Sequence, residues 1–199
     1  MKRLVAAILG FSLLFISGCS QMDVAASVGK TDIELATLQS RVDSILAERK
    51  KVDTSQMQLQ DGDVLTRSQL TFLISNLILD EIAGETGIEV TKADLEAYKA
   101  EIFQSIGGEE MLPSVLVNAA IAPEALDDVL RRDLILRKIG SALADSGATD
   151  GEINDLIQNL VREKSKLLKI VVNPRYGVWD PTSISVLGTD PAGDAVTNK

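Results

Sequence analysis

The sequence predicts a mostly α-helical domain in which a small two-stranded β element joins the N- and C-terminal segments. Three observations carry this prediction: a long apolar run at residues 63–84, apolar residues at helical spacing over most of the chain, and a short β-type run near each end. Few aromatic residues and many Leu, Ile, Val and Ala residues fit a helical core. A chain of 199 residues is long enough for one domain with a substantial core.

The apolar run at residues 63–84 predicts a helix that other helices surround. At 100° per residue its apolar side chains cover most of the circumference, which is typical of a buried or membrane-spanning helix. Arg67 and the Asp80–Glu81 pair interrupt the run, well short of the roughly 20 apolar residues that a bilayer span requires. We therefore expect a buried central helix that ends near Gly84 or Gly87, because glycine adopts the left-handed C-terminal conformation without steric cost.

Capping signals and prolines mark the helices that follow. Thr91 with Asp94 has the spacing of a capping box for a helix to about residue 106, and Thr149 with Glu152 has the same spacing for a helix to about residue 167. Between these two, Pro113 and Pro123 each predict the first turn of a further helix.

Two short β-type runs lie near the ends of the helical region. A lone strand would leave its backbone N–H and C=O groups unpaired, so we expect Val24–Val28 to pair with Leu168–Val172. After the first run we expect a helix that begins either with a capping box at Thr31 or near Leu35. Residues 49–63 are polar and have no period, which predicts a loop.

The first 18 residues have the features of a lipoprotein signal peptide. Lys2 and Arg3 form a positive region, an apolar segment follows, and Ile16-Ser17-Gly18-Cys19 resembles the bacterial lipobox. The lipobox implies lipidation of Cys19 with diacylglyceryl and palmitate, cleavage before it, and residues 19–23 as a short tether. Cys19 is the only cysteine, so no internal disulfide is possible, and a spare thiol would be a liability in an oxidising compartment. The alternative is a chance cysteine beside an ordinary signal peptide.

Lipidation at Cys19 predicts a protein on the extracytoplasmic face of the cell membrane, or of the outer membrane in a Gram-negative cell. Four residue steps lead from Cys19 to Asp23 and span at most roughly 14 Å, so the domain would lie close to the lipid surface. The chain has 20 basic and 29 acidic residues. Removing residues 1–18 takes away Lys2 and Arg3 and no acid. The overall acidic balance argues against nucleic acid as a partner and against a polybasic membrane-binding protein.

The residue inventory argues against catalysis. The chain has no histidine, which excludes Cys/His and Ser-His-Asp nucleophilic sites and any histidine-bearing metal site. The adjacent acidic pairs Glu109–Glu110 and Asp127–Asp128 diverge in direction on a helix, and we interpret them as solvated surface in preference to a cation or acid–base site. We expect no catalytic residue, no metal and no cofactor.

Three segments resemble the N-terminal domain of the SurA-type periplasmic chaperones: VAASVGKTDIELATLQSRVDSIL, LISNLILDEIAGETGIEVTKADLEAYKAEI and AIAPEALDDVLRRDLILRKI. The resemblance covers residues 24–181, which we expect to form one SurA N-terminal-like domain, followed by a disordered tail at residues 182–199. It implies a chaperone-like protein that binds unfolded or exported polypeptides. Full-length relatives insert parvulin-type prolyl isomerase domains before the last helix, where residues 144–150 form only a short link. We therefore expect no isomerase activity.

Candidate polypeptide-binding residues are those in apolar runs that exceed what one amphipathic face can bury, since exposed apolar patches mark interaction sites and methionine adapts to varied partners. They are Met57, Leu59, Phe103, Ile106, Met111, Leu112, Val115 and Leu116. The simpler alternative is that these side chains complete the core. Two other functions stay open: an accessory envelope lipoprotein that docks one fixed protein partner, and a degenerate peptidyl-prolyl isomerase.

Overall fold

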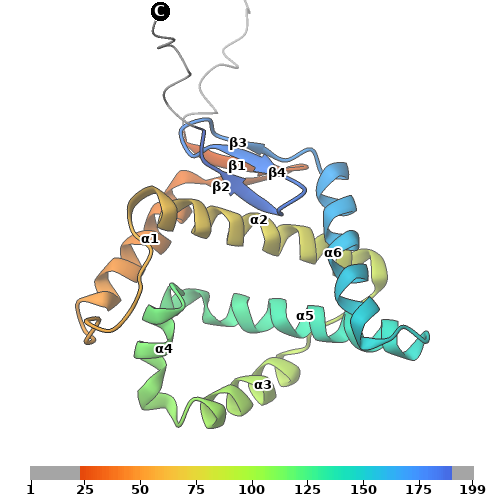
Figure 1. Ribbon diagram of the computed structural model, residues 1–199, viewed down its shortest axis with the longest axis horizontal. Helices are drawn as coiled ribbons and strands as arrows, with labels where there is room; N and C mark the ends of the chain where they lie inside the picture. The colour runs from red at the N-terminus through yellow and green to blue at the C-terminus, as the bar shows by residue number, and fades with distance from the viewer. Residues whose placement is uncertain (1–22, 190–199) are drawn as a thin grey trace, which may run out of the picture.

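A computed structural model describes residues 23–189 and shows a mostly helical molecule with a small sheet along one side of its longest helix (Figure 1). The mostly helical fold predicted from the sequence is confirmed. The predicted signal peptide, Cys19 and the end of the predicted tail lie outside the described residues. The elements follow in the order β1 (Val24–Val28), β2 (Thr31–Glu34), α1 (Leu35–Arg49), α2 (Gly62–Thr86), α3 (Lys92–Ser105), η1 (Glu109–Met111), α4 (Leu112–Asn118), η2 (Pro123–Ala125), α5 (Leu126–Asp145), α6 (Asp150–Leu167), β3 (Val171–Val172), β4 (Val178–Asp180) and β5 (Ser185–Leu187).

Helix α2 is the centre of the fold. It contacts α1, α5, α6, β1 and β5, and in Figure 1 it lies between the sheet on one side and α5 on the other. Ile74 and Ile78 are completely buried in the main core cluster. The helix ends at Gly87, which has a left-handed φ of 68° and donates its N–H to the carbonyl oxygen of Ala83. Of the helices in residues 23–189, none is long and apolar enough to cross a membrane.

The two ends of the described chain meet in one sheet. Strand β3 pairs antiparallel with β1, with Ala26 opposite Val172 and Ser27 opposite Val171. The predicted pairing of the terminal segments is therefore confirmed, although the second strand is only two residues long. Asn173 extends the junction, because its N–H donates to the carbonyl oxygen of Ala25.

The sheet has a third strand that the sequence analysis missed. Residues 31–34 form β2 and pair antiparallel with β1 in the sheet order β2-β1-β3. A tight turn at Gly29, which has a φ of 61°, returns the chain beside β1, and only Ile33 of β2 is buried. The first helix accordingly begins at Leu35, the second of the two predicted starts, and the two-stranded element is corrected to a three-stranded sheet.

A second hairpin corrects the predicted start of the C-terminal tail. Strands β4 and β5 pair antiparallel, with Trp179 opposite Val186, so the predicted tail boundary at residue 182 is too early. Val186 is 6% exposed, and its N–H donates to Oγ1 of Thr71 on α2 at 2.9 Å. Packing on α2 holds this segment in place. The sequence of residues 182–189 does not by itself indicate this packing.

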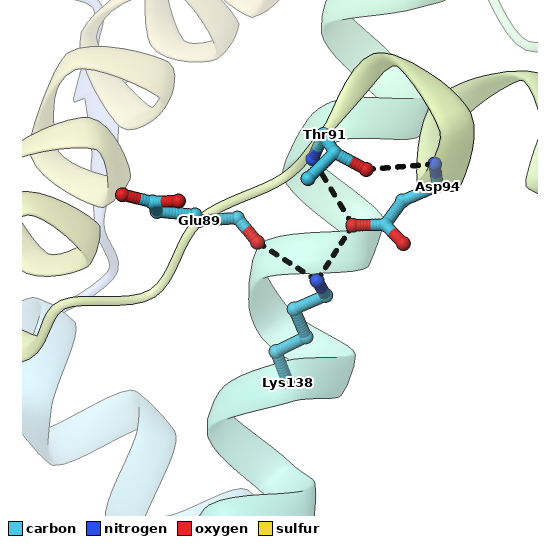
Figure 2. Close-up of polar contacts among 4 residues, drawn as sticks. All are labelled: Glu89, Thr91, Asp94 and Lys138. Atoms are coloured by element: carbon cyan, nitrogen blue, oxygen red, sulfur yellow. Dashed lines mark hydrogen bonds and ion pairs between the residues drawn. The ribbon is translucent and has the colours of Figure 1, made fainter.

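The predicted capping box at the start of α3 is present and is held by α5 (Figure 2). The N–H of Asp94 donates to Thr91 Oγ1 at 3.1 Å, and the N–H of Thr91 donates to Asp94 Oδ2 at 3.0 Å. Lys138 on α5 donates from Nζ to the same Oδ2 and to the carbonyl oxygen of Glu89, both at 2.7 Å. The hydrogen bond from Lys138, followed by those from Thr91, lowers the pKa of Asp94 to about 2.

Candidate polypeptide-binding site

Two adjoining pockets lie around α2, on the side of the helix that faces α5. The first has a volume of about 380 Å³ and is lined by residues of β2, α1, α2 and α5. The second has a volume of about 510 Å³ and is lined by residues 58–60, by α2, by the 118–121 turn, by α5 and by Ile184. Arg132 on α5 lines both pockets. Together they form one site, which we call the α1–α2–α5 cleft.

The first pocket has apolar walls held in place by ion pairs between helices. Its apolar lining includes Ile33, Leu73, Leu77 and Ile135. Arg41 on α1 donates from Nη2 to Asp128 Oδ2 on α5 at 2.5 Å, and a second ion pair joins Arg131 on α5 to Asp80 on α2. These two pairs connect all three helices around the pocket.

Two polar atoms of residues lining this pocket are buried without a partner. Nη1 of Arg41 and Oδ1 of Asn76 are both inaccessible to solvent and form no hydrogen bond with any residue in the range 23–189. Arg41 as a whole is only 9% exposed. Leaving a buried polar group unsatisfied costs about 1–3 kcal/mol. Arg41 and Asn76 thus place one donor and one acceptor in the wall of this pocket, and a rotation of either side chain toward the pocket would present it to the C=O or N–H group of a peptide backbone.

The second pocket combines apolar and amide side chains. Phe72, Ile121, Val129 and Ile184 supply apolar surface, while glutamine and asparagine side chains supply amides at Gln58, Gln60, Gln69 and Asn118. Buried Gln69 donates from Nε2 to the carbonyl oxygen of Ala120 at 2.9 Å, so a hydrogen bond joins α2 to the 118–121 turn in the lining of this pocket.

Phe72 connects the two pockets. The guanidinium carbons of Arg41 and Arg132 lie 5.3 and 5.5 Å from the centroid of its ring, within the range of cation–π attraction. Arg41 lines the first pocket and Arg132 lines both. The ring and the two cations therefore lie together where the two pockets adjoin.

Comparison with known families now places the chain. A family model described as the SurA-like N-terminal domain matches residues 3–140. The chain belongs to this family. Membership gives the protein a chaperone-like role in protein folding in general terms. No curated protein and no solved structure matches the chain.

The family match ends before α6, yet the remaining elements complete the same SurA-like domain. Helix α6 packs on α5 and α2, and β3 pairs with β1. Val161, Val172 and Val186 belong to the same core cluster as α2 and β1. The C-terminal segment thus shares one hydrophobic core with the residues that the family model matches.

All but one of the binding residues predicted from the sequence lie elsewhere in this SurA-like domain. Met111 and Val115 are exposed, at 47% and 37%, whereas Leu116 is buried at 4% in contact with the rest of the fold. Phe103, Ile106, Leu112 and Met57 are half-buried. None of these seven residues lines either pocket of the α1–α2–α5 cleft, whereas the eighth candidate, Leu59, lines the second pocket. Met111 and Val115 stay candidates for a separate apolar surface at the junction of η1 and α4.

Sequence reasoning missed the cleft, although two signals for it exist. Arg41 lies on the same face of α1 as the buried Leu38 and Ile45, and a charged side chain in an apolar stripe calls for a partner. Asn76 lies in the helix that is apolar on nearly all sides, where a buried amide requires hydrogen bonds. Both residues mark the position where α2 faces α1 and α5.

The Asp127–Asp128 pair also has a structural explanation. Asp127 forms an ion pair with Lys99 at 2.6 Å, and Asp128 accepts the hydrogen bond from Arg41. These two carboxylates therefore connect helices, and the prediction that they are only solvated surface is incomplete. Lys99 has a raised pKa because of its hydrogen bond with Asp127. Within residues 23–189 no group of three or more His, Cys, Asp or Glu side chains is arranged to hold a metal ion.

Proposed function

We propose that this protein is a lipid-anchored, extracytoplasmic chaperone-like protein that holds extended segments of unfolded or exported polypeptides in the α1–α2–α5 cleft, without isomerase activity. The observation that carries the proposal is the pair of unpartnered polar atoms, Arg41 Nη1 and Asn76 Oδ1, in residues that line an apolar pocket. Family membership supports the chaperone-like part of the proposal.

Main-chain recognition suits a protein with many clients. Every non-proline residue of an unfolded chain carries one N–H donor and one C=O acceptor, so a site that bonds to these groups is indifferent to sequence. The apolar walls at Leu73, Leu77 and Ile135 would accept a client side chain beside its backbone. Phe72 and the amide side chains of the second pocket would extend the contact along the client.

The lipid anchor is supported by the sequence around Cys19. The apolar segment and the Ile16-Ser17-Gly18-Cys19 motif resemble the lipobox. The anchor would concentrate the chaperone where exported chains emerge from the membrane. The acidic balance of the chain, with 29 acidic and 20 basic residues, would keep a complex with an unfolded client soluble.

The test compares two asparagine variants in an aggregation assay. A soluble form that begins at Ser20 is added to several unrelated denatured proteins, and light scattering is followed over time. Asn76→Leu removes the free acceptor in the pocket, and Asn154→Leu is the matched control at an exposed position of α6. We expect the unmodified protein and Asn154→Leu to suppress aggregation of all clients, and Asn76→Leu to suppress it less.

The melting temperature gives a second readout for the same variants. Replacing an unsatisfied buried acceptor with an apolar group is nearly neutral or stabilising, so Asn76→Leu should melt at the same temperature as the unmodified protein or higher. Weaker suppression by a variant of undiminished stability identifies Asn76 as a binding residue. Suppression of one client alone would favour the single-partner docking lipoprotein, and prolyl isomerase turnover that survives stringent purification would favour the degenerate isomerase.

A further inference from the structure

Strand β2 is an edge strand of the three-stranded sheet. The strand order is β2-β1-β3, so β2 pairs with β1 on one side and, among residues 23–189, with no strand on the other. An edge strand carries a row of unpaired backbone N–H and C=O groups, which is a template for pairing with another chain. All four residues of β2 line the first pocket of the α1–α2–α5 cleft, whereas no residue of β1 or β3 does. The free edge of β2 therefore borders the cleft.

The strand register shows which backbone groups point to this free edge. Leu35, directly after β2, donates its N–H to the carbonyl oxygen of Asp23, directly before β1, at 2.7 Å. Backbone N–H groups point alternately to the two edges of a strand. The N–H of Ile33 therefore points to β1, where Ile33 is opposite Ala26. The N–H and C=O of Asp32 and the N–H of Glu34 are consequently the groups that the free edge offers to another strand.

The side chains of β2 divide between the two faces of the sheet, because successive side chains of a strand point to opposite faces. Ile33 is buried and lines the pocket together with Leu73 and Leu77. Asp32 and Glu34 are exposed and point to the outer face, which is the face directed away from α2. Residues that are directly opposite one another in paired strands share a face. A residue paired with Ile33 would therefore meet the apolar lining of the pocket.

Asp32 and Glu34 carry negative charge that no cation neutralises in the described part of the chain. Neither acid forms an ion pair within residues 23–189, not even with Lys30 in the turn before β2. Across the strand they face the uncharged Ser27 and Val24 of β1. The Ser27 hydroxyl donates to Asp32 Oδ1 at 2.6 Å.

The other charges of the first pocket are engaged within the protein. Arg41 is paired with Asp128 and Arg131 with Asp80. The third arginine of the lining, Arg132, lies over the ring of Phe72 where the two pockets adjoin. The negative charge that remains beside the free edge is that of β2.

This charge pattern decides which kind of strand suits the edge. Opposite charges on directly opposite residues stabilise a strand pair, and like charges destabilise it. A second copy of β2 would bring Asp32 and Glu34 of one chain beside the same acids of the other, so pairing between copies is unfavourable. A basic side chain opposite each acid is favourable, and an unfolded chain has a free N–H and C=O at every residue except proline.

We propose that the free edge of β2 takes up an extended client segment as an additional β-strand and selects segments in which basic and apolar residues alternate. The basic residues lie opposite Asp32 and Glu34, and the apolar residue between them lies opposite Ile33 and enters the pocket. The inference rests on the proposed function and deepens it, because it names the client segments that the cleft prefers. Pairing with β2 leaves the second edge of the client available to Arg41 and Asn76.

The charge selection is tested with two labelled peptides. The probes are Thr-Val-Lys-Val-Lys-Val-Thr and the same peptide with glutamate in place of lysine, and fluorescence anisotropy measures their binding to the full chain in detergent. We expect the lysine peptide to bind about fivefold more tightly or better, since two opposite-charge pairs replace two like-charge pairs. Asp32→Asn combined with Glu34→Gln should remove most of this preference. Glu96→Gln combined with Glu101→Gln is the matched control, because it removes two exposed acids from α3, and it should leave the preference unchanged.

The strand pairing is tested by comparing Asp32→Pro with Asp32→Ala. Both variants lack the carboxylate, and only the proline variant lacks the backbone N–H at the free edge. Proline is tolerated in an edge strand where its nitrogen faces outward, so the two variants should melt at similar temperatures. We expect Asp32→Pro to bind the lysine peptide about tenfold more weakly than Asp32→Ala, because the client carbonyl loses its donor.

Peptide N-methylation tests the pairing without changing the protein, and it decides the matter should Asp32→Pro fail to fold. Two forms of the lysine peptide carry N-methyl groups on alternate residues, one form on the odd positions and the other on the even positions. Only one of these sets faces β2 in a paired strand. We expect the affinities of the two forms to differ by about tenfold.

Each contrary outcome overturns a stated part of the inference. Equal affinities of folded Asp32→Pro and Asp32→Ala, or of the two N-methylated peptides, overturn strand pairing at β2. Equal affinities of the unmodified protein for the lysine and glutamate peptides overturn the charge selection, and no binding of either peptide overturns both. In each case aggregation suppression that depends on Asn76 would leave the proposed function intact. Peptide binding that depends on Asp32, without suppression for any client, would refute the chaperone proposal and leave the strand pairing.

Discussion

Lys138 on α5 and Asp94 on α3 form an ion pair of 2.7 Å that fixes the start of one helix to the side of another (Figure 2). The same Asp94 oxygen accepts the N–H of Thr91, and the same Lys138 nitrogen donates to the carbonyl oxygen of Glu89. A local helix cap and a long-range contact therefore share one carboxylate. This arrangement holds the link between α2 and α3 against α5.

The Asp94 carboxylate predicts a defined acid sensitivity. Its pKa is lowered from 3.8 to about 2, first by the bond from Lys138 and then by those from Thr91. Because the pKa in the folded state lies below the unfolded value, the stabilisation is fully present above pH 3.8 and is lost as the pH falls toward 2. We expect Asp94→Asn to lower the melting temperature at neutral pH, and the difference from the unmodified protein to shrink between these two pH values.

The control for this prediction is Glu101→Gln, which removes an exposed carboxylate from the same helix. Glu101 forms no ion pair within residues 23–189, so its melting curve should follow that of the unmodified protein at every pH. A difference between Asp94→Asn and the unmodified protein that is the same at low and neutral pH would contradict the assigned role of Asp94.

The core around α2 predicts a large cost for shortening a buried side chain. Ile78 is completely buried in the main cluster, and replacing such a residue with alanine removes about 2–5 kcal/mol of stability. Val64 on the same helix is 50% exposed, and Val64→Ala should change stability by about 0.5 kcal/mol or less. Urea unfolding of both variants measures the two values. Equal effects would mean that α2 is not the centre of the core.

The pairing of β1 with β3 predicts that the C-terminal segment is needed for the fold. Truncation after Lys166 removes β3, the bond from Asn173 to Ala25 and the core contribution of Val186. We expect the shortened protein to melt at a much lower temperature or to lose its cooperative transition. The control is truncation after Thr189, which removes only residues from the predicted disordered tail and should leave the melting curve unchanged. A truncated protein with full stability would argue against the closing role of β3.

Cys19 is predicted to carry the lipid that attaches the protein to the membrane. Cys19→Ala should leave the precursor uncleaved and abolish acyl labelling, because diacylglyceryl transfer needs the thiol and cleavage follows it. Mass spectrometry of the mature N-terminus measures both effects. Ser20→Ala is the control and should be processed normally. A mature protein that begins at another residue and carries no lipid would disprove the predicted localisation.

Local patterns in the sequence were sufficient for most of the helical framework. The period of residues 63–84 predicted α2, Gly84 or Gly87 its end, of which Gly87 is the observed cap, and Thr91 with Asp94 the start of α3. These features depend on backbone geometry and side chains within a few residues of one another. The strand β2 and the hairpin β4–β5 were missed because residues 31–34, 178–180 and 185–187 become strands only through partners elsewhere in the chain.

What the sequence by itself determined about this protein is its fold class, its helix boundaries and the motif around Cys19. Only the tertiary structure decided which distant residues come together to form the α1–α2–α5 cleft. Arg41 and Asp128 are 87 positions apart, and Asn173 and Val24 are 149 positions apart, so neither the cleft nor the outer face of the sheet has a continuous sequence. The physical reason is that burial, and with it the presence of an unpaired donor or acceptor, depends on which helices pack together and not on local spacing.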